Sequence, residues 1–217
     1  MSASTMESIR KLAALGIAGA ALSAISGAVV QLAVQPSTSV SDEMWSYPWS
    51  SGAFVVVSIV YAALHMFVIA GLVGLRRSRM AGPTRAAAAG ASTAIAGTAF
   101  LLAGEVASLP IRHDRTDDTG AMVVGAIFGL GVALSAVGFL IVGRESLRHG
   151  MWHDWRRFTP LATGLWTTAL VGISFTKALP AGVAVYALCL LALFVALYTR
   201  PAASVLPAPA SAQAQTA

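Results

Sequence analysis

The sequence predicts an all-α, polytopic membrane protein: a six-transmembrane-helix bundle built of three helical hairpins. Of its 217 residues, 57% are hydrophobic and only 11% are charged, whereas about a quarter of the residues of a soluble domain carry charge. Apolar runs of about twenty residues recur along the chain, and a helix of that length crosses a hydrocarbon core of roughly 30 Å. The charged residues gather between these runs, so we expect the runs to lie in lipid.

The six spans are expected at 11–34, 52–75, 86–110, 119–143, 158–179 and 180–199, which together form a transmembrane domain over 11–199. A short cytoplasmic N-terminus at 1–10 precedes them. The first run is longer than the apolar core of about 7–15 residues in a signal peptide, so we expect it to be retained. The segment 200–217 is mostly Pro, Ala, Ser and Gln, and is expected to form a disordered cytoplasmic tail.

Arginine and lysine collect in alternate connections, which sets the orientation. The bases of the N-terminal flank and of the second and fourth connections are Arg10, Lys11, Arg76, Arg77, Arg79, Arg85, Arg144, Arg148, Arg156 and Arg157. The first connection has none. The pattern predicts that both termini lie in the cytoplasm, and the Arg, Ala and Gly bias favours a bacterial inner membrane. Because the bases flank apolar runs, the net charge of +5 points to anionic lipids and not to nucleic acid.

Small residues recur every four positions in several runs. They are Gly19, Ser23 and Gly27; Ala86, Gly90, Ala94 and Thr98; and Gly125 with Gly129. Small side chains on one face let two helices approach closely in lipid. The stripes predict packing between helices of the same chain, and a homo-oligomer or another membrane partner stays open.

Glu105 is the most informative single residue, because a carboxylate inside a span is costly unless it is paired or hydrated. Lys177 lies near the same depth in the fifth run, and Gln31 lies near the outer end of the first. We expect these three residues to form a polar cluster. An ion pair between Glu105 and Lys177, a carboxylate that handles protons or substrate, and a water-filled vestibule are the alternatives.

Two further features could contact a ligand. His65, near the middle of the second run, is expected to hydrogen bond with polar residues of the fifth run at 166–168. Trp45, Tyr47 and Trp49 stand in the first outer loop, either as an interfacial aromatic belt or as a lid over the bundle. His65 is the only histidine inside a span, so a pair of haem ligands is lacking, and we expect no cofactor.

The connection from Glu145 to Phe158 predicts an amphipathic interfacial segment. Arg148, Arg156 and Arg157 are expected to contact anionic lipids, while the apolar side chains face the acyl chains. The apolar set is Leu147, Met151, Trp152, Trp155 and Phe158. His149 and His153 would share one helix face but have no evident third ligand, so no metal site is expected. The single Cys189 excludes an intramolecular disulfide.

The arrangement resembles small bacterial six-helix integral membrane proteins of unknown function. The shared features are a polar loop at 39–51, the run Gly74-Leu75-Arg76-Arg77 that ends the second span, an Asp-rich loop before the fourth span and Trp155-Arg156-Arg157 before the fifth. The resemblance covers 12–199 and consists mainly of topology. It implies a fold and no activity.

These features favour a non-enzymatic accessory protein, either lipid-interacting or partner-binding, with no catalytic residues. Two alternatives remain. One is a small transporter or permease with an outward-facing vestibule at Glu105. The other is a membrane enzyme acting on a lipid, although the sequence shows no nucleophile motif, metal cluster or Asp-rich pyrophosphate site at the cytoplasmic face.

Overall fold

The computed structural model describes residues 3–174 and 176–199, which are helical apart from their connections and contain no β-strand. The helices are α1 (Ala3–Val29), the π-helical η1 (Val30–Val34), α2 (Gln35–Ser37), α3 (Ser51–Ser78), α4 (Arg85–Ser108), α5 (Thr119–His149), the 3₁₀ turn η2 (Trp155–Phe158), α6 (Thr159–Ile173) and α7 (Leu179–Tyr198). The predicted all-α class is confirmed. The tail expected at 200–217 lies outside the described residues.

Within the described chain, five helical stretches are long and apolar enough to cross a membrane. They are Ser4–Ser37, Ser51–Ser78, Arg85–Ser108, Thr119–His149 and Leu179–Tyr198. The predicted membrane-protein class rests on these five. The remaining long element, α6, has 15 residues and ends at Ile173, short of the position 179 expected for the fifth span. In contrast, α5 continues past the expected position 143 to His149.

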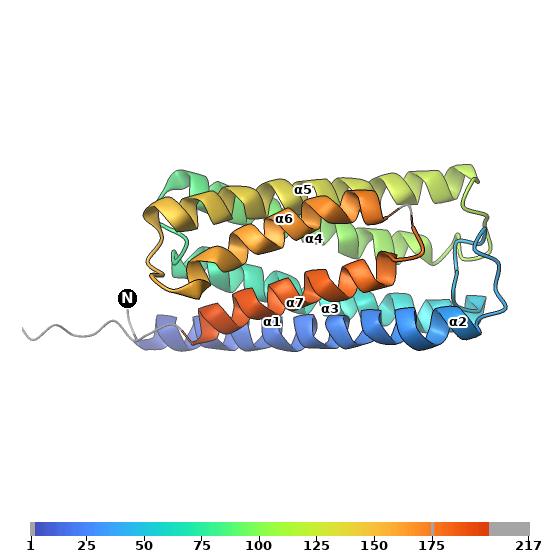
Figure 1. Cartoon of the computed structure of the whole chain (residues 1–217), viewed down its shortest axis with the longest axis horizontal. Helices are drawn as coiled ribbons and strands as arrows, with labels where there is room; N and C mark the ends of the chain where they lie inside the picture. Colours follow the sequence, from blue (N-terminus) through green and yellow to red (C-terminus); the bar gives the residue numbers. More distant parts are fainter. Residues whose placement is uncertain (1–2, 175, 200–217) are drawn as a thin grey trace, which may run out of the picture.

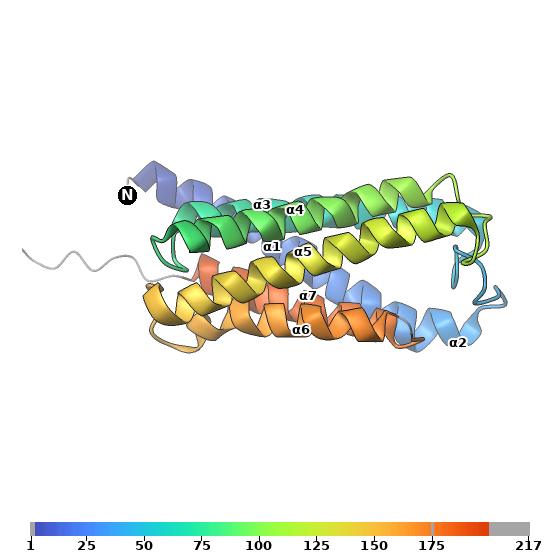
Figure 2. The ribbon, with the colours of Figure 1, turned by 90° about the horizontal axis from the view of Figure 1, so that it is seen from above.

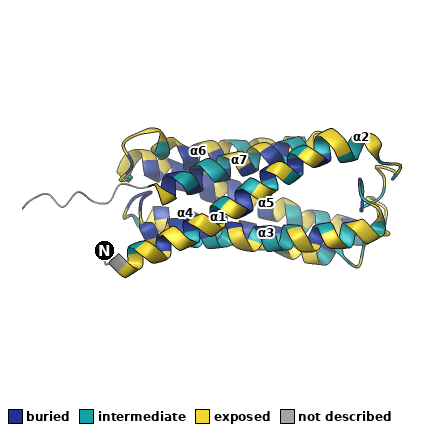
Figure 3. Ribbon diagram, turned by 90° about the horizontal axis from the view of Figure 1, so that it is seen from below, coloured by how far each residue is buried: buried dark blue, intermediate teal, exposed yellow. Residues whose placement is uncertain are grey.

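The long helices form a closed ring. Each packs against its neighbour in the chain, α1 with α3, α3 with α4, and so on to α6 with α7, and α7 returns to pack against α1. The helices lie nearly parallel to one axis and alternate in direction (Figure 1). Helices α1 and α5 are the most tilted in Figure 2. Helix α1 runs from the α3–α4 side at its start to the α7 side at its end, and α5 runs from beside α4 at its start to beside α6 at its end (Figures 2 and 3).

Glycine allows the closest approach, between α4 and α5. A Cβ placed on Gly138 would meet the backbone nitrogen of Ala94, and it would lie 2.7 Å from the Gly90 carbonyl oxygen. The stripe of α1 packs similarly, since a Cβ on Gly19 would lie 2.8 Å from Phe67 and one on Gly27 2.7 Å from the Pro180 carbonyl. These two stripes therefore serve contacts within the chain. The same prediction is wrong for Gly125 and Gly129, because a Cβ on Gly129 would meet nothing within 4 Å and one on Gly125 would lie 4.0 Å from the Trp45 ring.

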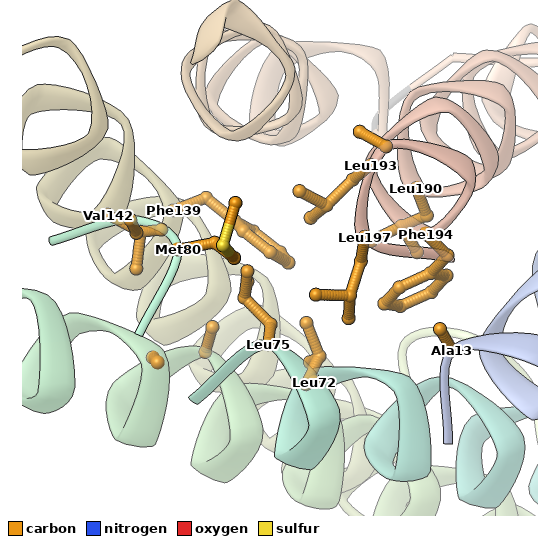
Figure 4. Packing of buried hydrophobic residues seen from close by; sticks show 14 of the residues in the cluster. Ala13, Leu72, Leu75, Met80, Phe139, Val142, Leu190, Leu193, Phe194 and Leu197 are labelled. Carbon is orange, nitrogen blue, oxygen red and sulfur yellow. The ribbon is translucent and has the colours of Figure 1, made fainter. Parts of the chain in front are cut away.

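The large buried side chains lie toward the end of the bundle that holds the start of α1 and the end of α7 (Figure 3). Phe194, Leu193 and Leu197 of α7 meet Leu72 of α3 and Phe139 of α5 there, and all five are fully buried (Figure 4). Many apolar side chains elsewhere on the long helices are exposed, as expected for surfaces that face lipid.

Candidate functional site

The two ends of the bundle differ in charge. The start of α1, the α3–α4 connection, the end of α5, η2 and the end of α7 lie together at one end, the basic end (Figure 1). Its charged residues, among those described, are the ten bases Arg10, Lys11, Arg76, Arg77, Arg79, Arg85, Arg144, Arg148, Arg156 and Arg157, and the three acids Glu7, Glu145 and Asp154. The opposite end holds the three bases Arg112, Arg115 and Lys177, and the five acids Asp42, Glu43, Asp114, Asp117 and Asp118.

A hollow of about 540 Å³ opens at the basic end between α1, α3 and α4. Arg76, Arg77, Arg79 and Arg85 line it. None of these four guanidinium groups forms an ion pair with another described residue. The hollow therefore concentrates four positive charges that the described protein leaves uncompensated.

A tight connection brings the four arginines together. Helix α3 ends at Ser78, and the next residue, Arg79, has a left-handed φ of 54°. The chain turns again at Gly82 with φ of 124°, a value that glycine adopts without strain. The backbone N–H of Gly82 donates to the Arg79 carbonyl at 3.0 Å. Thr84 then caps α4 by accepting a hydrogen bond from the N–H of Ala87 at 3.0 Å. The end of α3 and the start of α4 consequently face the same hollow.

Glu145 is a buried acid that sequence reasoning did not single out. Its side chain is 3% exposed at the end of α5. The Thr84 hydroxyl donates to its Oε2 at 2.7 Å, and Arg144 pairs with its Oε1 at 2.8 Å. Glu145 thus connects α5 to the start of α4, and both oxygens of its carboxylate already have a partner within the protein. Its position beside Arg144 was the only signal available in the sequence.

The three arginines expected to contact anionic lipids differ in their surroundings. Arg148 and Arg157 are exposed. The Arg157 guanidinium carbon lies 4.6 Å from the centre of the Phe158 ring. Arg156 is partly buried and pairs with Asp154 at 2.8 Å. Two of the three therefore have free positive groups at the surface, and Arg156 is engaged within the protein.

The apolar side chains of the segment 145–158 also differ in their exposure. Met151, Trp155 and Phe158 are about half exposed or more, as a membrane-facing set requires. Trp152 is 3% exposed and belongs to the core cluster with Met80. Its expected place at the acyl boundary is therefore wrong: a short loop folds the ring inward over the end of the bundle, where it covers apolar side chains.

Glu105 does not pair with Lys177. The Lys177 ammonium lies 2.8 Å from Asp42 in the first outer loop. The Glu105 carboxylate, on α4, interacts with the hydroxyl of Ser58 on α3. Ser58 itself is 2% exposed. The predicted Glu105–Lys177 ion pair is therefore wrong. Lys177 lies beyond the end of α6, in the turn before α7, and from there it reaches an exposed loop.

Gln31 also lies apart from Glu105. Its amide nitrogen donates to the Gln35 side chain at 2.9 Å, and its oxygen accepts from the backbone N–H of Ala181 at 3.3 Å. This second contact joins η1 to the start of α7. Glu105, Lys177 and Gln31 therefore do not form the expected polar cluster, because each of them contacts different residues.

His65 bonds within its own helix. Its Nδ1 lies 2.9 Å from the carbonyl oxygen of Tyr61, one turn earlier in α3. Trp166, expected as a neighbour, instead donates from Nε1 to the Gly182 carbonyl at 2.8 Å. The Tyr61 hydroxyl pairs with Ser26 of α1 at 2.8 Å. His65 thus has no hydrogen bond to α6, because α3 and α6 lie on different sides of the ring.

The aromatic outer loop packs on protein. The Trp45 ring lies over α5, with its centre 6.5 Å from the centre of the Phe128 ring. The backbone N–H of Trp45 donates to the Asp114 carbonyl at 2.9 Å. Tyr47 and Trp49 are half-buried. This arrangement fits a cover over the bundle end better than a belt of free aromatic rings in lipid.

The Asp42–Lys177 pair makes stability depend on pH. The hydrogen bond and charge of Lys177 hold the pKa of Asp42 below its usual value, and Asp42 raises the pKa of Lys177 in the same way. The contribution of the pair is complete between the ordinary Asp pKa of about 3.9 and the ordinary Lys pKa of about 10.4. It is lost as the pH falls through the lowered pKa of Asp42, and also as the pH rises through the raised pKa of Lys177. We expect Asp42→Asn to lower the melting temperature slightly at pH 7 and low salt.

Melting curves at several pH values check this dependence. The difference between wild type and Asp42→Asn should shrink as the pH falls below about 3.9, and it should shrink in high salt because both groups are exposed. Asp114→Asn, at the same end of the bundle and in no ion pair with a described residue, serves as the comparison. A difference for Asp42→Asn that grows toward acidic pH contradicts the pair.

Among the described residues, no three His, Cys, Asp or Glu side chains are grouped so that they could hold a metal ion. The arrangement offers instead four uncompensated guanidinium groups at one end and a carboxylate in contact with a serine between α3 and α4. No protein-family model matches the chain, and no curated protein or solved structure shows significant similarity to it.

Proposed function

We propose that the chain is a six-span protein of the bacterial inner membrane that acts without catalysis as a lipid-interacting accessory protein. The observation that carries this proposal is the charge of the basic end, with ten bases and three acids among the described residues. Anionic lipids attract such a surface by about 1 kcal/mol per base near the membrane. Exposed Arg148 and Arg157, beside the exposed apolar residues Trp155 and Phe158, suit the boundary between headgroups and acyl chains.

Two features support the sixth span and the orientation. Helix α6 packs along both α5 and α7, and each of these two helices is long and apolar enough to cross a bilayer. Because α6 lies between two such helices, we propose that it lies in the bilayer with them. The basic end faces the cytoplasm under the positive-inside rule, which places both termini there.

The lipid interaction is tested by thermal unfolding of the purified protein in nanodiscs. Replacing phosphatidylcholine with phosphatidylglycerol should raise the melting temperature, and salt should reduce the gain. The double variant Arg148→Gln, Arg157→Gln should lose part of the gain, whereas Arg112→Gln, at the opposite end, should retain it. An equal melting temperature in both lipids would remove the basis of the proposal.

A second candidate, a small transporter with an outward-facing vestibule, is favoured by one observation. Glu105 has no ion pair with any described residue, and its near partner is the hydroxyl of Ser58. An unpaired carboxylate inside a span is a functional candidate by default. A vestibule requires water at this depth, reached from the side opposite the basic end.

Cysteine accessibility tests both the orientation and the vestibule. The native Cys189 is first replaced by alanine, and single cysteines are placed at Ser41, Arg148 and Ser58. A membrane-impermeant thiol reagent added to intact cells should label Ser41→Cys and not Arg148→Cys; the reverse pattern would overturn the orientation. Labelling of Ser58→Cys from outside supports the transporter, and protection from both sides rejects it.

A further inference from the structure

The arginine-lined hollow has the form of a binding site for a single ligand. Arg76 and Arg77 project from the last turn of α3, and Arg85 from the first turn of α4. Buried Leu75 and exposed Ala88 contribute apolar walls to the same hollow. Figures 2 and 3 show the start of α1 beside the α3–α4 connection, so that three helices surround it.

The acids of the basic end are already engaged. Glu7 pairs with Lys11 at 2.8 Å, Glu145 with Arg144 at 2.8 Å, and Asp154 with Arg156 at 2.8 Å. Each acid thus neutralises a base outside the hollow. The four arginines that line the hollow are exposed and have no acidic partner among the described residues, so they are available to an anion from outside.

Guanidinium groups favour phosphate over other anions, because their paired N–H donors match two phosphate oxygens at once. The start of α4 adds a favourable partial charge for an anion. The apolar walls favour a phosphate that carries uncharged carbon groups. The position of the hollow, beside exposed apolar residues of α4, favours a ligand that continues into the bilayer.

We propose that the hollow binds the phosphate and glycerol of one anionic phospholipid. The headgroup contacts Arg76, Arg77, Arg79 and Arg85, and the acyl chains leave past Ala88 along the surface of α4. This proposal rests on the proposed contact of the basic end with anionic lipid. It adds a defined site that holds one molecule, distinct from the exposed surface of Arg148 and Arg157.

Native mass spectrometry of the full-length protein in detergent tests the site with phosphatidylglycerol as the probe. The wild type should retain one phosphatidylglycerol at concentrations where phosphatidylcholine is not retained. Arg76→Gln with Arg77→Gln should lower occupancy of that first lipid at least tenfold. Arg148→Gln with Arg157→Gln removes the same charge from the surface outside the hollow, and should leave first-lipid occupancy within about twofold of wild type.

A second variant separates shape from charge. Ala88→Phe keeps all four arginines and fills the hollow from the helix surface, so it should also displace the first lipid. Melting curves in lipid-free detergent verify that each variant is folded. Competition with inorganic phosphate distinguishes the source of the anion: millimolar phosphate that displaces the lipid completely would indicate a site for a free phosphate and overturn the lipid assignment.

The outcomes separate this site from the general lipid interaction. If both double variants lose the lipid equally, charge acts diffusely and the defined site is overturned, while the lipid-interacting role survives. If phosphatidylglycerol is never preferred over phosphatidylcholine, both proposals fail. If only the double variant Arg76→Gln, Arg77→Gln and the variant Ala88→Phe lose the first phosphatidylglycerol, the defined site is established.

Discussion

Replacing Gly138 with alanine is expected to destabilise the bundle by about 1–3 kcal/mol, the usual cost of overpacking. The added Cβ would meet the backbone nitrogen of Ala94, and would lie 2.7 Å from the carbonyl oxygen of Gly90 and 2.8 Å from the Ala94 Cα. These atoms belong to the backbone of α4, so no side chain can rotate away. The two helices must separate to make room, which weakens a long contact between α4 and α5.

Gly129→Ala is the matched control, because it makes the same change on the same helix. Apart from the neighbouring backbone of α5 itself, no atom of the described residues lies within 4 Å of the Cβ that it would add. Alanine favours helix by up to about 1 kcal/mol over glycine, so this variant should hold or gain stability. Unfolding in mixed detergent micelles measures both. Equal changes of the same sign in the two variants would contradict the close α4–α5 approach.

Phe194→Ala should cost about 3–5 kcal/mol, the range for removing a buried aromatic ring. Phe194 is fully buried, and its ring fills the space between Gly16 of α1 and Gly71 of α3. Figure 4 shows the ring beside Leu190 and Leu197 on α7. Removing it leaves a cavity where three helices meet, and van der Waals packing is a main source of association between helices in lipid.

Leu188→Ala, on the same helix, provides the comparison. Leu188 is 53% exposed, so its side chain contacts surrounding lipid in the folded protein and leaves no cavity when shortened. We expect its cost to stay below about 1 kcal/mol, in the range of surface substitutions. The same unfolding assay ranks the two variants. A cost for Leu188→Ala equal to that for Phe194→Ala would show that α7 is not anchored through the Phe194 ring.

The sequence predicted the helices well and their ends less well. Hydropathy falls at Arg144, so the fourth span was expected to end at position 143, but α5 continues to His149. Arg, Glu and Leu favour helix whether or not lipid surrounds them. A hydropathy boundary therefore marks the edge of the membrane and not the end of the helix. Helix α6 ends at Ile173, before the expected position 179, and the apolar pattern of this run does not mark that end.

The candidate sites show a different limit. Depth along a span can be counted from the sequence, and it placed Glu105 and Lys177 at similar heights. Depth does not tell which way a side chain faces around the bundle, and Lys177 faces Asp42. The four arginines of the hollow were visible as an orientation signal. Their convergence depends on the left-handed residue Arg79 and on the diagonal path of α1, which only the structure reveals.

If α6 is the sixth span proposed above, its length has a consequence for the membrane around the protein. Its 15 residues give about 22 Å of helix, against the roughly 30 Å of an average hydrocarbon core, while α5 on its flank has 31 residues. Hydrophobic mismatch of this kind thins the bilayer locally. Lipid beside α6 is then compressed relative to lipid beside α3 and α4. When the acyl chain length of the lipid is changed, the packing of the α6–α7 hairpin should be the first to change.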